Sequence, residues 1–289
     1  MPSVDGDLAP MGHDWAMSTM VPKSPTVKAL AEVWGRLDEL LTALDETSWS
    51  APTPLPGWDV KAVVAHLIGT EAMLQGEPTP DVEIDPAEFQ HVRNDMGRIN
   101  EAWVASMADL APVELLTRFR DQTARRLAAL RDTYQADWDT EGFTPAGIDT
   151  YGRFMRIRVF DCWFHEQDIR DAVGQPGGEE GVAARAALDE MEAAIGYVVG
   201  KKAAAPAGSR VTFVLSGPAA RTIDVEVGER AKVVDELDGP ATVTLTMPLG
   251  VFSRLAGGRA DPQTLRPQVR IEGDEELGER IVANLAYTI

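Results

Sequence analysis

Two acidic residues and a histidine on one predicted helix have the spacing of a metal-binding motif. Asp161 and His165 are four residues apart, and Asp168 follows three residues later. Positions i and i+4 of a helix share one face, so a carboxylate and an imidazole at this spacing can bind one cation from the same side. Asp168 lies one turn further along that face. Two ligands do not complete a site, and the chain has only four histidines.

His66 is the other histidine that lies in a strong helical pattern. It follows the predicted turn Pro56-Gly57, with Asp59 as a helix N-cap or first-turn acid. The helical period does not fix whether its side chain faces the interior. Taken alone, His66 is better explained as a partly buried helix histidine bonded to a carbonyl. Taken alone, Asp161 and His165 are equally open to interpretation as an ordinary hydrogen-bonded i,i+4 pair.

Together the two motifs resemble the mycothiol-dependent maleylpyruvate isomerase family. The resemblance rests on Pro-Gly-Trp-x-Val-x5-His, ending at His66, and on the later acid-x-x-x-His-x-x-Asp helix from Asp161 to Asp168. It extends from about residue 26 to the C-terminus and implies a DinB-like four-helix domain. Carried over by position, it implies that His66, Asp161 and His165 are the metal ligands. The family usually has Glu where this chain has Asp161, one methylene shorter.

The ligand set indicates the chemistry. Two imidazoles and one carboxylate are typical of catalytic zinc sites with an open coordination position, although Fe(II) uses the same trio. The resemblance implies that mycothiol binds as thiolate and adds to a small electrophile, ending in isomerisation or S-transfer. The partners are then a small-molecule thiol and its electrophilic substrate. Such a metal lowers the pKa of a bound thiol.

Other residues are candidates for supporting roles. Asp168 is predicted to orient His165 or a neighbouring arginine. Arg158 is predicted to bind a substrate carboxylate, together with Arg153, Arg156 and Arg170 on the same helix. Further along the chain, Arg254 and Arg259 border a Gly pair and are predicted to contact the thiol cosubstrate. For any one of these arginines, a solvated surface position is the simpler interpretation.

Two non-enzymatic interpretations remain open. In the first, the chain binds metal without catalysis and its C-terminal part binds a lipid or a partner. In the second, His66, Asp161 and His165 form a purely structural buried polar network.

Composition excludes several classes of protein. The 289 residues carry a net charge of −19, which disfavours binding to nucleic acid or to anionic membranes. No apolar run approaches the roughly 18 residues needed to span a bilayer. The single Cys162 cannot form an internal disulfide, so a cytoplasmic location is the simplest. The composition leaves the oligomeric state open.

The hydrophobic period changes along the chain and predicts an α+β protein. Residues 1–25 are expected to form a disordered extension, and residues 26–200 the DinB-like helix bundle. Residues 201–289 are expected to form a smaller sterol-carrier-like α+β domain, because alternating strand patterns begin near Lys201. The predicted helices of the bundle span 27–44, 59–74, 86–110, 112–134, 151–173 and 180–199. Residues 136–150 are expected to be a loop.

Overall fold

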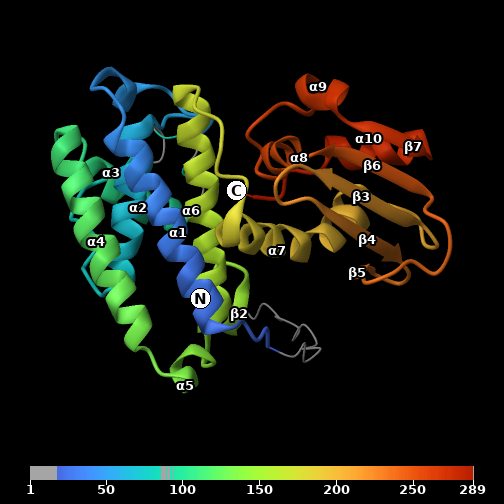
Figure 1. Ribbon diagram of the computed structural model, residues 1–289, viewed down its shortest axis with the longest axis horizontal. Coiled ribbons are helices and arrows are strands. Elements are labelled where there is room, and N and C mark those ends of the chain that lie inside the picture. The colour runs from blue at the N-terminus through green and yellow to red at the C-terminus, as the bar shows by residue number, and fades with distance from the viewer. Residues whose placement is uncertain (1–17, 86–88, 90–91, 93, 289) are drawn as a thin grey trace, which may run out of the picture.

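The structure is a computed structural model that describes residues 18–85, 89, 92 and 94–288. A helical half and a sheet-containing half lie side by side, with α7 between them (Figure 1). This arrangement confirms the predicted α+β class with an N-terminal bundle and a smaller C-terminal sheet domain. Among the described helices, none combines the length and the apolar composition that a membrane crossing requires.

Within the part of the chain that the structure describes, five long helices build the N-terminal half. They are α1 (Lys23–Thr42), α2 (Val60–Leu74), α3 (Asp95–Ser106), α4 (Pro112–Asp132) and α6 (Tyr151–Val173). Helix α1 packs against α4 and α6, and α2 packs against α3, α4 and α6. Short 3₁₀ turns occupy Thr47–Ser50 and, in the other half, Arg266–Gln268. The bundle therefore places the two predicted ligand helices, α2 and α6, in contact.

Local capping explains where the two ligand helices begin and end. The Asp59 carboxylate accepts a hydrogen bond from Ala62 N at 2.8 Å and caps α2. Thr150 caps α6 by accepting from Arg153 N at 3.1 Å. Helix α6 ends at Gly174, whose φ of 64° lies in the left-handed region that favours glycine.

The N-terminal half differs from the prediction at three places. Residues 136–150 contain α5 (Gln135–Trp138) and the hairpin β1 (Glu141–Thr144) and β2 (Gly147–Thr150), where a loop was expected. Helix α1 begins at Lys23, inside the segment expected to be a disordered extension; residues 1–17 lie outside the described residues. Helix α3 begins at Asp95 instead of Pro86, because Asn94 caps it through Gly97 N at 2.8 Å.

Long-range contacts hold the hairpin in place. Thr19 N donates to Asp149 Oδ1 at 2.7 Å, and the fully buried indole of Trp138 donates to Val21 O at 2.7 Å. The hairpin is thus fastened to the chain that leads into α1. Such a contact between distant segments leaves no local period in the sequence.

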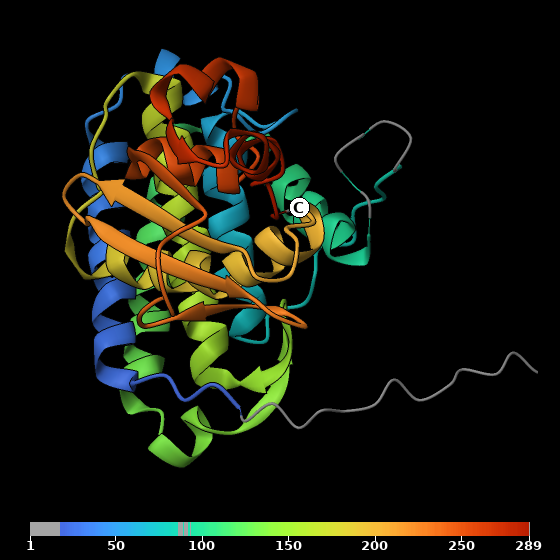
Figure 2. The same ribbon diagram turned by 90° about the vertical axis from the view of Figure 1, so that its right-hand side faces the viewer.

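Helix α7 (Gly181–Tyr197) and a π-helical turn (Val198–Lys202) lead to the C-terminal sheet. Its strands are β3 (Arg210–Ser216), β4 (Arg221–Val227), β5 (Ala231–Val234), β6 (Val243–Pro248) and β7 (Arg270–Gly273). Their order is β5-β4-β3-β6-β7, with β3 and β6 parallel and the other pairs antiparallel. Three helices complete the domain: α8 (Leu249–Ala256), α9 (Pro262–Leu265) and α10 (Glu275–Ala283). Figure 2 shows the sheet in front of the helices when the molecule is turned.

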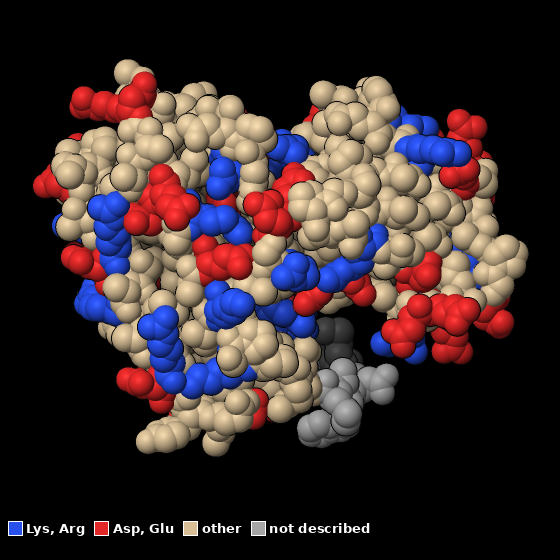
Figure 3. Space-filling view, viewed as in Figure 1, with Lys and Arg blue, Asp and Glu red and all other residues tan. Residues whose placement is uncertain are grey.

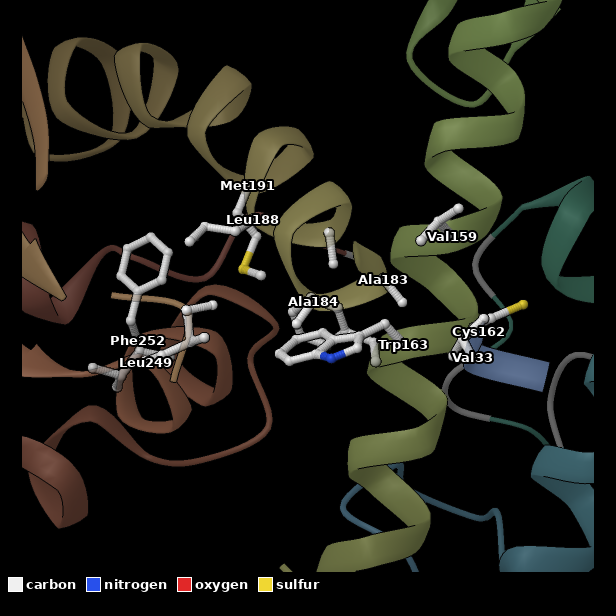
Figure 4. Close-up of a cluster of buried hydrophobic side chains, with 14 of the residues drawn as sticks. Val33, Val159, Cys162, Trp163, Ala183, Ala184, Leu188, Met191, Leu249 and Phe252 are labelled. Atoms are coloured by element: carbon white, nitrogen blue, oxygen red, sulfur yellow. The ribbon is translucent and has the colours of Figure 1, made fainter. Parts of the chain in front are cut away.

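An apolar cluster joins the two halves. Trp163 of α6 is fully buried, beside Ala183 and Ala184 of α7, and reaches toward α8 of the C-terminal half (Figure 4). Its indole N–H donates to Gly178 O at 2.7 Å. Nearby, a Cβ on Gly257 would lie 2.3 Å from Phe164 Cε1, so only glycine allows this close approach. The loop after α8 therefore lies against the ligand helix.

Charges are distributed differently over the two halves. Figure 3 shows basic and acidic side chains interspersed on the helical half, whereas acidic side chains gather at one end of the sheet domain. Interspersed charges are typical of a surface stabilised by ion pairs, and several of these pairs involve α6.

Candidate metal centre

The structure brings together the three residues predicted as metal ligands. His66 of α2 and Asp161 and His165 of α6 each offer a ligand atom, all within 4.8 Å of one another. His66 Nε2 lies 3.6 Å from Asp161 Oδ2, and His165 Nε2 lies 3.6 Å from Asp161 Oδ1. Donors bound tetrahedrally to one zinc ion at about 2.1 Å are about 3.4 Å apart. The separations therefore suit a shared cation better than direct hydrogen bonds.

The imidazole of His66 is buried without a hydrogen bond. The residue is 5% exposed, and among the described residues neither ring nitrogen has a hydrogen-bond partner. This rules out the simpler interpretation of a helix histidine bonded to a carbonyl. Burial lowers the pKa of His66 and so favours the neutral ring, which is the form that binds metal. An unpaired polar atom in the interior costs free energy, and a bound cation would remove that cost.

Asp161 lies at the open side of the site, with 31% of its side chain exposed. Burial of the carboxylate would raise its pKa, but Arg158, His165 and His66 together outweigh this and hold the pKa of Asp161 well below its usual range. Arg158 Nη1 donates to Asp161 Oδ2 at 2.5 Å. Asp161 is therefore an ionised oxygen donor at neutral pH.

Asp168 lies behind His165, away from the other two ligands. His165 Nδ1 is 3.1 Å from Asp168 Oδ2, and Asp168 is 1% exposed. An ionised carboxylate only accepts hydrogen bonds, so this contact puts the ring proton on Nδ1 and leaves the Nε2 lone pair facing Asp161. Arg259 Nε donates to the other oxygen of Asp168 at 2.9 Å. The predicted influence of Asp168 on metal binding stays a prediction.

Trp58, from the Pro-Gly-Trp turn, forms an aromatic wall of the site. Its ring centroid lies 5.1 Å from that of His66 and 6.3 Å from that of His165. The indole N–H donates to Glu101 Oε2 of α3 at 3.1 Å. Gly57, with φ of 86°, makes the turn that brings this ring back over α2. The motif was recognised in the sequence, but no role for its tryptophan was predicted.

Two charged residues near the site were missed in the sequence. Glu71 of α2 and Arg126 of α4 are 2% and 5% exposed, and both belong to the charge network around Arg158. A signal was present: Glu71 is the only acidic residue of α2 and follows Leu67 and Ile68 at helical spacing, on the apolar face. A charge on a buried face requires a partner.

The arginines predicted to bind ligand are engaged with the chain's own carboxylates. Arg158 bonds to Glu71 and Asp161, Arg254 to Asp171, and Arg259 to Asp168. Arg254 and Arg259 cross from the C-terminal half to α6 in doing so. The other arginines of α6 pair elsewhere on the chain: Arg153 with Asp149 and Glu190, Arg156 with Glu190, and Arg170 with Glu166. The predicted contacts with substrate and thiol stay predictions.

Known proteins resemble the chain over nearly its whole length. The family model of the mycothiol maleylpyruvate isomerase N-terminal domain matches residues 30–170, and that of the family's C-terminal domain matches residues 185–280. An uncharacterised protein in two strains of Mycobacterium tuberculosis is 27% identical over 158 residues. That match spans 54% of this chain and 59% of the relative.

Solved structures show the same fold. A mycothiol-dependent maleylpyruvate isomerase superposes with a TM-score of 0.55 at 18% identity, covering 87% of this chain and 93% of the other. A histidine-to-alanine mutant of that enzyme gives a TM-score of 0.54 with the same coverage. Both domain models match in the expected order, and the two-part fold agrees with them. The chain belongs to the mycothiol-dependent maleylpyruvate isomerase family.

Proposed function

We propose that this chain is a metal-dependent enzyme that activates a low-molecular-weight thiol, mycothiol, for reaction with a small electrophile. The observation that carries the proposal is the convergence of His66, Asp161 and His165, with a buried His66 imidazole that has no hydrogen-bond partner among the described residues. Family membership supports the identity of the thiol. A divalent cation, zinc in our proposal, would supply a Lewis acid that lowers the pKa of the thiol.

The chain's own residues would prepare this chemistry. His66 presents a neutral imidazole, His165 presents Nε2 on the side of Asp161, and Asp161 presents an ionised oxygen on the open side of the site. Trp58 covers one side of the imidazoles and limits access of water to them. Asp168 fixes the tautomer of His165. A thiol and an electrophile would therefore approach from the side of Asp161.

We infer that S-transfer is the reaction, with cis-trans isomerisation as the second candidate. Transfer needs an activated thiolate, which forms a bond from sulfur to carbon while the leaving group departs with its electron pair. Isomerisation of a keto-diacid also needs cations that hold two carboxylates during rotation and elimination. Each of the six arginines predicted to contact substrate or thiol is already paired with a carboxylate of the chain. This pairing supports transfer.

The test combines metal analysis with a substrate panel. Purified protein should contain about one equivalent of metal, and His66→Ala should lose it, whereas His13→Ala should keep it. Metal-loaded protein should accelerate the reaction of mycothiol with monochlorobimane, and a rate with maleylpyruvate would point to isomerisation instead. Metal without acceleration on any electrophile would favour the alternative of a non-catalytic metal protein. Absence of metal in a folded protein would favour the structural network.

The structural network has one observation against it. The nearest atoms of Asp161 lie 3.6 Å from each imidazole Nε2, which is longer than a hydrogen bond. Without a ligand, the network would leave His66 unpaired, at a cost of about 1–3 kcal/mol.

The cytoplasmic location expected from the single cysteine stays a prediction.

A further inference from the structure

Four charged side chains of alternating sign form a continuous chain that ends at the metal centre. Arg126 Nε of α4 lies 3.2 Å from Glu71 Oε2 of α2. The other oxygen, Glu71 Oε1, accepts from Arg158 Nη2 at 2.8 Å and from Arg158 Nε at 3.1 Å. Arg158 Nη1 then donates to Asp161 Oδ2 at 2.5 Å. Glu71 thus forms an ion pair with Arg126 and is hydrogen-bonded to Arg158, through which it reaches a proposed ligand.

The first three members of this chain are buried. Glu71, Arg158 and Arg126 are 2%, 4% and 5% exposed. Water therefore does not screen their charges, and each depends on its neighbours for compensation. Asp161 differs, because 31% of its side chain is exposed. Arg158 donates a hydrogen bond to this partly exposed carboxylate.

Glu71 determines how Arg158 is oriented. Two N–H groups of the guanidinium converge on one carboxylate oxygen, which fixes both the position and the plane of the group. With the plane fixed, Nη1 points toward Asp161. Asp161 Oδ2 accepts the hydrogen bond from Nη1 of Arg158. The other oxygen, Asp161 Oδ1, lies on the side of His165, 3.6 Å from its Nε2.

We propose that Glu71 is a positioning residue of the metal centre, acting through Arg158 on Asp161. The proposal rests on the proposed function in that it requires His66, Asp161 and His165 to bind a divalent cation. It assigns Arg158, predicted from the sequence to bind a substrate carboxylate, to ligand orientation instead. Partners of metal ligands commonly change metal affinity by about 10–100-fold when they are removed.

The matched control is Glu166. Like Glu71 it is a buried carboxylate between two arginines, Arg36 and Arg170, and it is 0% exposed. It lies on α6 itself, but its arginine partners are bonded to no proposed ligand. Glu71→Gln and Glu166→Gln therefore remove the same kind of charge from the same kind of site. Only the first lies in the chain of bonds to Asp161.

The experiment measures Zn²⁺ affinity by competition with a chromophoric chelator, and the visible spectrum of the Co²⁺-loaded protein. Glu71→Gln should bind Zn²⁺ about 10–100-fold more weakly and change the Co²⁺ bands, whereas Glu166→Gln should match the wild type. In an Arg158→Met background, Glu71→Gln should cause no further loss of affinity. Should Glu71→Gln not fold, Glu71→Asp replaces it, because the shorter acid withdraws from Arg158.

The outcomes separate this proposal from the proposed function. Wild-type protein that binds no Zn²⁺ overturns both. Wild-type affinity and an unchanged Co²⁺ spectrum in folded Glu71→Gln overturn the positioning role alone. Equal losses in Glu71→Gln and Glu166→Gln also overturn it, since a general loss of stability then explains both. A full additional loss in the Arg158→Met background would show that Glu71 does not act through Arg158.

Discussion

Cys162 follows a proposed ligand directly in the chain, yet its thiol faces the bundle interior. The residue is 0% exposed, and Arg158 Nη2 lies 3.5 Å from its sulfur. Burial raises the pKa of the Cys162 thiol to about 12. At neutral pH the side chain is therefore a packed thiol and offers no thiolate to a metal or an electrophile.

This raised pKa predicts how stability depends on pH. An unfolded cysteine titrates near about 8.5, so above that pH the unfolded chain releases the Cys162 proton before the folded chain does. The contribution of Cys162 to the free energy of unfolding is therefore constant below about pH 8.5 and falls as the pH rises toward 12. From pH 7.5 to 9.5 the free energy of unfolding should fall by about 1.4 kcal/mol more in the wild type than in Cys162→Ala. Urea titrations at both pH values measure it; parallel changes in the two proteins would contradict it.

The contact between Asp168 and His165 gives a second prediction. Asp168→Ala removes the acceptor of His165 Nδ1 and should weaken metal affinity by about 10–100-fold, because the ring loses its fixed tautomer. Asp171→Ala is the control, since Asp171 lies one turn further on α6 and also pairs with an arginine of the C-terminal half. Isothermal titration with Zn²⁺ measures both. Equal Zn²⁺ affinities of the two variants would show that Asp168 does not support metal binding.

The ligands could be named from the sequence because each lies in a local motif. Asp161 and His165 are one helical turn apart, and His66 follows a recognisable turn and cap. The pairing of Arg158 with Glu71 and that of Arg259 with Asp168 could not be named in the same way. Glu71 and Asp168 lie 87 and 91 positions from these arginines, and only the packing of helices and domains brings them together. Spacing within one helix carries no information about such pairs.

Close contact between helices makes two glycines respond differently to the same substitution. Gly69 lies on α2 one turn after His66, and a Cβ there would be 2.5 Å from Trp103 Cβ on α3. Gly35 lies within α1 on an exposed position, and a Cβ there would meet nothing within 4 Å. Alanine is favoured over glycine inside any helix. Whether a glycine-to-alanine substitution raises or lowers the free energy of unfolding therefore depends on the space around the new methyl group.

We expect Gly35→Ala to stabilise the protein by about 0.5–1 kcal/mol, from the gain in helix propensity alone. Gly69→Ala should destabilise it, because the overpacking of about 1–3 kcal/mol exceeds that gain. Denaturant unfolding measures both variants. Stabilisation by both would show that α2 and α3 separate easily, contrary to the close packing of Trp103.

The difference between a local sequence pattern and a long-range contact also explains which elements could be predicted from the sequence. Long amphipathic helices have a period that the sequence displays, and α2, α4 and α6 lie close to their predicted ranges. The hairpin β1–β2 has strands of four residues, too short for a recognisable alternation. Thr19, the partner of Asp149 in the hairpin, and Val21, the partner of Trp138 in the adjoining α5, lie more than 100 residues earlier. Contacts of that kind are set by the bundle and not by the local sequence.

At the scale of the whole molecule, two ion pairs cross between the halves and have different neighbours. Arg259 of the C-terminal half pairs with Asp168, which contacts His165, whereas Arg254 pairs with Asp171, which contacts no proposed ligand. Among the ion pairs of the described residues, the pair of Arg259 with Asp168 is thus the one that connects the C-terminal half to a proposed ligand. The pair of Arg254 with Asp171 therefore serves as a control for the stability that is lost when the interface between the halves is weakened.

Arg259→Met should weaken Zn²⁺ affinity by about 10-fold, because Asp168 loses the cation that holds its position. Arg254→Met should leave the affinity unchanged, while both variants should lose a similar amount of stability. Chelator competition and thermal unfolding, measured on the same samples, give the two quantities. An affinity loss shared by both variants would instead mean that the whole interface supports the centre.

The strand order of the C-terminal sheet has a consequence for how copies of the chain meet. Its outer strands, β5 and β7, have four residues each. On β7 the side chains of Arg270 and Glu272 are exposed and paired with each other. Short, charged outer strands are poor templates for the addition of a strand from another molecule. We therefore expect the outer strands of the sheet to resist edge-to-edge pairing with another copy of the chain.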